Sequence, residues 1–225
     1  MKKIYLLCAG ILFVMLSACK KDAPDFTGYD LSNLPGATTG DPIEGNYQPV
    51  TKDSYWKYAS ADLGSDPDTT TTIMLGTTAT YDGKSFKVAS NKFASETETG
   101  TINFYHSGYT YSVREISETD TSEILYLKAD AAVGATWNAD LYNPATDSKG
   151  IGKIIEKGIT KVVKGKTFNN VVHTRVELQV KESTGLFTTA STVDFYIAKD
   201  VGIIEEDVAI FGITGKTELF DYSIK

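Results

Sequence analysis

Histidines are the first residues in this chain to examine for catalysis. The sequence has only two, His106 and His173, and hydrolytic chemistry would need one of them beside a nucleophile and an orienting acid. The sequence contains no Gly-x-Ser-x-Gly motif, no His-Glu-x-x-His motif and no glycine loop that could cradle a phosphate. We therefore predict no catalytic residues and no cofactor.

Three aspartates, Asp62, Asp66 and Asp68, lie close together in a segment that also contains Gly64 and Pro67. Carboxylate oxygens on a loop are suitable calcium ligands. Their spacing, however, does not match the EF-hand loop, in which a glycine directly follows the third aspartate and a glutamate comes later. We therefore predict a solvated acidic loop and no metal site.

Composition excludes two further classes of function. The chain of 225 residues has 22 Lys and Arg against 29 Asp and Glu, which gives a net charge of −7. A nucleic-acid-binding protein needs a basic face, so nucleic acid is not an expected partner. Two cysteines and two histidines leave little for a structural zinc site or a disulfide framework.

The first eighteen residues have the layout of a secretory signal. Lys2 and Lys3 are followed by an apolar run from Ile4 to Leu16, which is shorter than the ~20 residues that a bilayer-spanning helix needs. A short transmembrane anchor or a buried helix is the alternative, but the charged residues 20–22 follow immediately. We predict that residues 1–18 are removed, which would take away Lys2, Lys3 and Cys8 and change the net charge from −7 to −9.

Leu16-Ser17-Ala18-Cys19 resembles the lipobox of bacterial lipoproteins. The resemblance implies that Leu16, Ser17 and Ala18 are recognised by the lipoprotein signal peptidase and that the Cys19 thiol receives a diacylglyceryl group. Several acyl chains would anchor the protein firmly in a membrane. Because Lys20 is not the aspartate of inner-membrane lipoproteins, the resemblance favours the outer membrane of a Gram-negative bacterium. Lys20, Lys21, Asp22 and Asp25 indicate either a cell-surface tag or a solvated tether. The protein could therefore lie on the periplasmic face of that membrane or on the cell surface.

The mature chain divides into a tether and one domain. Residues 19–48 are rich in proline and glycine and poor in periodic apolar positions, which predicts a flexible tether. From Pro49 to Lys225 threonine, tyrosine and valine are frequent, as in half-buried strands. We expect a single β-rich domain over residues 49–225.

Alternation of apolar and polar residues defines the expected strands. Between Val171 and Lys181 alternate apolar positions predict one dry face, and the remaining residues, His173 among them, predict one wet face. Turn sequences at Asp82-Gly83, residues 106–108 and Lys164-Gly165 predict hairpins. Residues 118–132 are ambiguous, and a strand is favoured over a helix. We predict a mainly β fold, an antiparallel meander of about ten strands curled into a half-barrel or barrel, with a two-sheet sandwich as the alternative.

The order of several short motifs resembles that of uncharacterised Gram-negative envelope lipoproteins. The motifs are a Pro-x(5–6)-Trp-x-Tyr-like opening at residues 47–58, a Gly-x-x-Trp turn at 134–137, the run Phe-Asn-Asn-Val at 168–171, and a Tyr-x-Ala-x-x-Val-Gly-(Ile/Leu)-(Ile/Val) ending at 196–204. The opening departs from the pattern, because Asp53-Ser54-Tyr55 stands where a glycine usually precedes the tryptophan. The family implies a β-rich secreted fold and no catalytic residues. Gly202 is expected at a tight turn.

Aromatic side chains are the candidate ligand contacts. Trp56, Tyr58, Tyr105, Tyr109 and Tyr111 could stack on sugar rings if they were exposed. The alternative is core packing, which we also expect for Trp56 and Trp137 as large side chains whose N–H groups need partners. The expected function is a non-enzymatic binding module for an apolar small molecule, a glycan or an envelope partner. An accessory subunit of an outer-membrane complex and an uncharacterised hydrolase are the alternatives.

Overall fold

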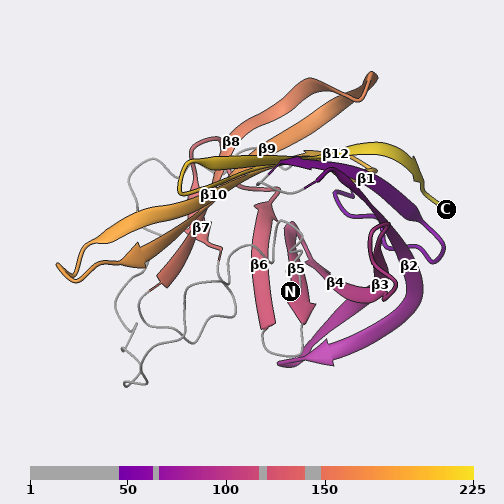
Figure 1. Ribbon diagram of the computed structural model, residues 1–225, viewed down its shortest axis with the longest axis horizontal. Coiled ribbons are helices and arrows are strands. Elements are labelled where there is room, and N and C mark those ends of the chain that lie inside the picture. Colours follow the sequence, from indigo (N-terminus) through magenta and orange to yellow (C-terminus); the bar gives the residue numbers. More distant parts are fainter. Residues whose placement is uncertain (1–45, 63–65, 117–120, 140–147) are drawn as a thin grey trace.

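The computed structural model describes residues 46–62, 66–116, 121–139 and 148–225. These residues form one antiparallel sheet of twelve strands that rolls into a nearly closed barrel (Figure 1). The strands are β1 (Tyr55–Asp62), β2 (Asp68–Tyr81), β3 (Lys84–Phe93), β4 (Gly100–Ser107), β5 (Thr110–Ile116), β6 (Thr121–Lys128), β7 (Thr136–Asn138), β8 (Ser148–Val163), β9 (Lys166–Lys181), β10 (Phe187–Ala198), β11 (Gly202–Ile210) and β12 (Ile213–Ser223).

The meander and the barrel are confirmed, and the two-sheet sandwich is wrong. The sheet order runs from β6 back to β1, then from β12 back to β7, so that the first and last strands pair with each other. The expected number of about ten strands was too low. One reason is β7, which is too short to show an alternation. None of the described residues forms a helix with the length and apolar character of a membrane span.

Each of the three predicted hairpins is present. Asp82 and Gly83 connect β2 to β3 with φ values of 50° and 76°, and Lys164 and Gly165 connect β8 to β9 with φ values of 46° and 78°. Positive φ at both central residues is the geometry that matches the twist of paired strands. The ambiguous stretch 118–132 contains β6, so the preference for a strand is confirmed.

Side chains help to join β6 to the strands across the remaining gap of the barrel. The Leu125 N–H donates to the Ala139 carbonyl at 2.9 Å. The Trp137 indole N–H donates to Leu125 O at 2.8 Å, and the Thr174 hydroxyl donates to Tyr126 O at 2.8 Å. Further along, Lys157 Nζ donates to the carbonyls of Ala129 and Ala131. These bonds satisfy the carbonyls of Leu125 and Tyr126 on β6 and of Ala129 and Ala131 just beyond it.

The inner face of the barrel holds the apolar core. On β9, Val172, Thr174, Val176 and Leu178 are buried, as their alternation predicted. The expected packing of both tryptophans is confirmed, since Trp56 is 1% and Trp137 3% exposed. The Trp56 N–H donates to Val201 O at 2.7 Å. Gly202 follows Val201 directly and has a φ of +104°, a backbone conformation that residues with a side chain rarely adopt.

Two residues that sequence analysis placed in the tether also belong to this core. Tyr47 is fully buried and Gln48 is 4% exposed. The Tyr47 N–H faces the Tyr111 hydroxyl at 3.4 Å, and the Tyr126 hydroxyl lies 3.5 Å from Gln48 Oε1. The chain therefore enters the barrel beside its aromatic side chains before β1 begins.

Candidate functional site

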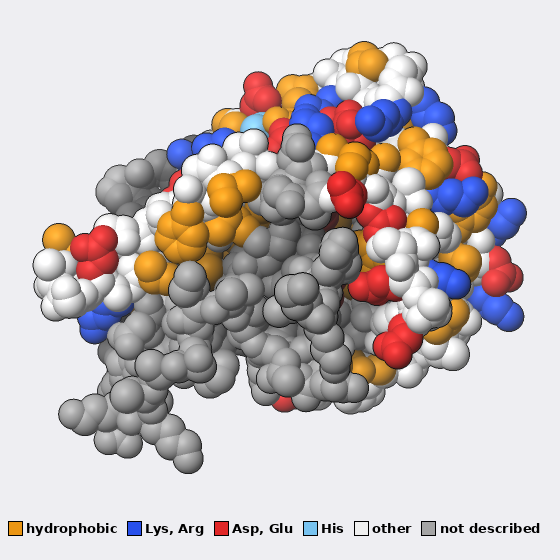
Figure 2. All heavy atoms as spheres, in the orientation of Figure 1, with side chains coloured by type: hydrophobic (Ala, Val, Ile, Leu, Met, Phe, Trp, Pro, Cys, Tyr) orange, Lys and Arg blue, Asp and Glu red, His pale blue; other side chains and the backbone are white. Residues whose placement is uncertain are grey.

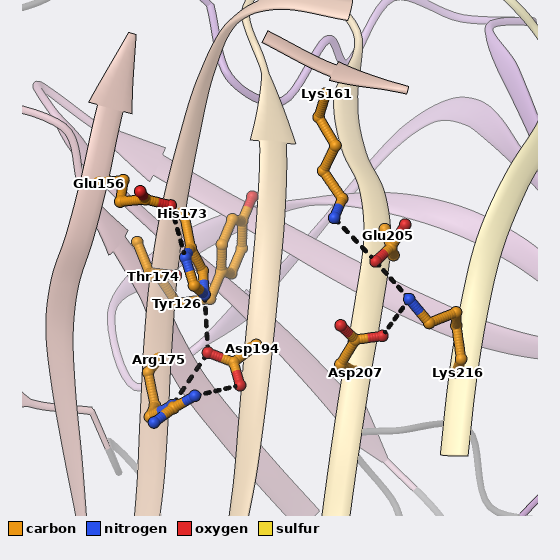
Figure 3. Close-up of polar contacts among 10 residues, drawn as sticks. All are labelled: Tyr126, Glu156, Lys161, His173, Thr174, Arg175, Asp194, Glu205, Asp207 and Lys216. Carbon is orange, nitrogen blue, oxygen red and sulfur yellow. Dashed lines mark hydrogen bonds and ion pairs between the residues drawn. The ribbon is translucent and has the colours of Figure 1, made fainter. Parts of the chain in front are cut away.

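Two rows of mostly charged residues lie on the outer face of strands β9 to β12. In antiparallel pairing, residues directly opposite each other share a face. Arg175 pairs with Asp194, Asp194 with Asp207, and Asp207 with Lys216. One row further along, His173, Tyr196, Glu205 and Glu218 lie opposite one another in the same strand order. We call these two rows the charged face (Figure 3).

Asp194 is the centre of the first group of contacts on the charged face. Arg175 donates from Nε to Oδ1 at 2.9 Å and from a terminal nitrogen to Oδ2 at 2.8 Å. His173 Nε2 lies 2.7 Å from the same Oδ1. Burial alone would raise the pKa of Asp194, but the hydrogen bonds from His173 and Arg175 outweigh it and hold that pKa below its usual value.

His173 corrects one expectation from the sequence. It lies on the outer face, as its place in the alternation predicted, but it is only 7% exposed and not on a wet face. The Tyr196 ring stacks on it with centroids 4.3 Å apart, and Glu156 Oε2 lies 3.4 Å from its Nδ1. Both ring nitrogens therefore face carboxylates.

Glu205 is the centre of the second group. It is 3% exposed and lies between two lysines, with Lys161 Nζ at 3.0 Å and Lys216 Nζ at 2.7 Å from Oε1. Lys216 also reaches Asp207 Oδ1 at 2.9 Å. Burial would lower the pKa of Lys216, but its bonds to Glu205 and Asp207 outweigh burial and raise it. A buried carboxylate is stable only with such partners.

The long β8–β9 hairpin folds over the charged face and reaches β12. Lys161 Nζ lies 3.4 Å from the centroid of the Tyr196 ring, and Lys164 forms an ion pair with Glu218 at 2.6 Å. The Phe168 ring contacts Tyr222, with centroids 6.1 Å apart. These contacts fix the hairpin to β10 and β12.

A hollow of about 490 Å³ opens at the edge of the charged face. It lies over β10, β11, β12 and the end of β1, and we call it the outer hollow. Its lining residues combine carboxylates, one lysine, two threonines and small apolar side chains, namely Ala61, Thr192, Asp194, Asp207, Val208, Ala209, Thr214, Gly215, Lys216 and Glu218. Its volume is within the range of small-molecule sites.

The five predicted contact aromatics lie elsewhere. Trp56 and Tyr111 are inside the barrel at 1% exposure each, and the Tyr58 hydroxyl donates to Ile203 O at 3.0 Å. Tyr105 is partly buried against Phe86, and Tyr109 is exposed at the β4–β5 turn. None of the five lines the outer hollow. Their role as ligand contacts stays a prediction.

His106 and Asp68, two further candidates from the sequence, also do not line the outer hollow. His106 is at a hairpin end, where its Nε2 lies 2.6 Å from Gly108 O. Asp68 accepts a hydrogen bond from the Ser95 hydroxyl, and no group of three or more metal-ligating side chains occurs among the described residues. Leu16, Ser17, Ala18 and Cys19 are outside the described residues.

Apart from His173, sequence analysis did not single out the residues of the charged face. One signal was available, because Glu205-Glu206-Asp207 places three carboxylates in succession within a strand. Since side chains alternate between faces, at least one of the three must point into the barrel. The pairing of Glu206 with the core residue Phe195 identifies it as that residue.

Comparison with known proteins gives two structural similarities. No protein-family model matches the sequence, and no curated protein does. A structure from Bacteroides fragilis, provisionally named as an exported protein with a YmcC-like fold, covers 80% of this chain and 100% of its own, with 9% identity and a TM-score of 0.48. A structure from Parabacteroides distasonis, provisionally named as a lipoprotein, covers 80% of this chain and 99% of its own, with 11% identity and a TM-score of 0.48.

Proposed function

We propose that this chain is a lipid-anchored lipoprotein of a Gram-negative outer membrane whose barrel is a non-enzymatic binding module. The outer hollow is its ligand site. The observation that carries this proposal is the hollow itself, a concave site bordered by charged side chains that already hold one another in place. Such prearranged polar groups lower the cost of ordering the site when a ligand binds.

The lining of the outer hollow favours a polar ligand over an apolar small molecule, which was one of the three ligands expected from the sequence. Four of its side chains are charged and two are hydroxyls, whereas the aromatic side chains are packed inside the barrel. The surroundings of the histidines support binding over hydrolysis. His173 faces Glu156 and Asp194, and Nε2 of His106 faces a backbone carbonyl, so none of these contacts within the described residues places a hydroxyl or thiol nucleophile beside a histidine.

A ligand-binding assay with a filled hollow tests the proposal. Ala209→Trp on β11 would place a large side chain in the outer hollow, and Thr188→Trp at an exposed position of the neighbouring strand β10 is the control. We expect a concentrated extract of envelope glycans and metabolites to raise the melting temperature of the wild type and of Thr188→Trp. Ala209→Trp should show no such rise. An equal shift in all three proteins, or in none, would reject the outer hollow as the site.

Anchoring is tested separately through Cys19. In the native host, the wild-type protein should enter the outer-membrane fraction and carry acyl chains on its N-terminal peptide by mass spectrometry. Cys19→Ser should lack the acyl chains, because a hydroxyl does not replace the thiol in the transfer. Acylation elsewhere in the chain, or an unmodified wild-type cysteine, would contradict the anchor.

Docking on another envelope protein is the second candidate, and exposed apolar turns favour it. Leu186 and Phe187 at the β9–β10 turn and Phe211 and Ile213 at the β11–β12 turn are 68%, 37%, 71% and 57% exposed. Figure 2 shows hydrophobic side chains gathered at this end, over β10. Such patches often mark contact surfaces. Chemical crosslinking in intact cells should lose one defined product in Leu186→Ser/Phe211→Ser if this candidate is correct.

A further inference from the structure

We infer that the outer hollow selects a neutral carbohydrate, a ligand with many hydroxyl groups and no net charge. The inference rests on the proposed function and adds the class of ligand. It follows from three properties of the lining, which are its hydrogen-bonding groups, the pairing of its charges and its small apolar residues.

The hydrogen-bonding groups match hydroxyls. Thr192 and Thr214 line the hollow, and within the described part of the chain neither side chain has a hydrogen bond. A threonine hydroxyl can donate one bond and accept others, which is what a sugar hydroxyl also does. Lys216 Nζ donates to Glu205 and lies 2.9 Å from Asp207 Oδ1 in an ion pair, so at least one of its three N–H groups remains to donate. The carboxylates of the lining add acceptors.

The pairing of the charges disfavours an ionic ligand. Each of the three carboxylates in the lining already has a cation, Arg175 for Asp194, Lys216 for Asp207 and Lys164 for Glu218. A cationic ligand would have to compete with these internal partners. An anionic ligand would meet three carboxylates and a single lysine, Lys216, which already contacts Asp207 of the lining and Glu205 outside it. A neutral ligand can bond to the outward lone pairs of the carboxylates without breaking any ion pair.

The small apolar residues leave room for a sugar ring. Ala61, Ala209 and Gly215 lie among longer side chains, which makes the surface concave at this place. Their C–H groups offer an apolar floor for the C–H face of a pyranose. A volume of about 490 Å³ is enough for a short run of sugar units.

Affinity electrophoresis distinguishes the ligand classes. The purified acylated protein in a non-ionic detergent would run in native gels that contain a neutral polysaccharide of glucose, mannose, galactose or xylose, an acidic polygalacturonate, or a cationic chitosan. We expect at least one neutral polysaccharide to retard the protein and the two charged ones to have no effect. Retardation by a charged polysaccharide alone, or by none of them, would overturn the inference.

Isosteric variants connect the binding to the hollow. Thr192→Val/Thr214→Val removes both hydroxyls with little change in volume, and Thr189→Val removes an exposed hydroxyl of β10, the strand of Thr192, outside the lining. Affinity for the neutral polysaccharide should fall at least fivefold in the double variant and stay unchanged in the control. Equal affinity of both variants would reject the inference, while a thermal shift that Ala209→Trp abolishes would still support the binding module.

Discussion

Glu115 on β5 and Glu206 on β11 carry carboxyl groups on the inner face of the barrel. Glu115 pairs with the core residue Ile102, and Glu206 pairs with Phe195. Burial raises the pKa of Glu115 to about 7, and the charge of Glu206 adds to the effect. Burial also raises the pKa of the nearby Tyr58 and Tyr126, with a smaller contribution from Glu206 in each case. An ionised Glu115 therefore costs folding free energy.

Replacing this carboxyl should change how stability depends on pH. The folded-state pKa of Glu115 is above its usual value of 4.5, so the wild type binds the proton more tightly when folded and loses stability as pH rises from about 4.5 through 7. We expect Glu115→Gln to lack this loss and to be relatively more stable at pH 8 than at pH 5, by about 2–3 kcal/mol at most. Urea unfolding at the two pH values measures the difference.

The control is Glu98→Gln, an exposed glutamate that should leave the pH dependence unchanged. Glu206→Gln provides a second check, because it removes the charge next to Glu115 and should lower the pKa of Glu115. The loss of stability at high pH would then be smaller than in the wild type. Identical pH slopes in the wild type and Glu115→Gln would contradict the assignment.

At the scale of the element, the three-residue strand β7 depends on one close contact. A Cβ atom on Gly152 of β8 would overlap the Trp137 indole ring, and Trp137 lies opposite Gly152 in the pairing of β7 with β8. The same indole bonds to Leu125 O on β6. The glycine therefore lets one side chain connect β6, β7 and β8.

Gly152→Ala should accordingly destabilise the barrel by about 1–3 kcal/mol, because the buried ring cannot move without losing its hydrogen bond. Denaturant unfolding gives the free energy. Gly100→Ala on β4 is the matched control, since its Cβ would lie 3.7 Å from the nearest atom, Asn91 O, which is ordinary contact. In a Trp137→Ala background the cost of Gly152→Ala should disappear. A full cost in that background would show that the ring is not the cause.

At the scale of the whole molecule, closure depends on residues far apart in the sequence. β1 pairs with β12 over most of its length, from Tyr55 with Ser223 to Asp62 with Gly215. Such pairing contributes free energy only after most of the chain has been ordered, which makes folding slow and cooperative. The last strand is therefore expected to be essential for the fold.

Removing residues 213–225 should abolish cooperative unfolding, because both β1 and β11 would lose a neighbouring strand. Circular dichroism during thermal unfolding measures the loss. Removing only Lys225 is the control, since this exposed residue contributes a bond from its N–H to Ser54 Oγ. That shorter deletion should retain a sharp transition close to that of the wild type. A sharp transition after loss of β12 would mean that the barrel can remain open.

Local patterns in the sequence determined much of the fold. Alternation identified the buried positions of β9, paired turn residues located the hairpins at Asp82 and Lys164, and the size of the two tryptophans predicted their burial. These features depend on neighbouring residues in the chain, so they can be recognised in the sequence without a structure. The signal and the lipobox at Cys19 are equally local, and they remain predictions from the sequence.

Only the tertiary structure decided which distant charges meet. His173 alternates like a surface residue, yet Tyr196, Asp194 and the β8–β9 hairpin bury it. The outer hollow likewise combines residues of β1, β10, β11 and β12, whose side-by-side placement depends on strand register across more than a hundred residues of chain. Barrel closure brings these residues together, and the secondary-structure propensities of neighbouring residues do not predict which distant strands pair.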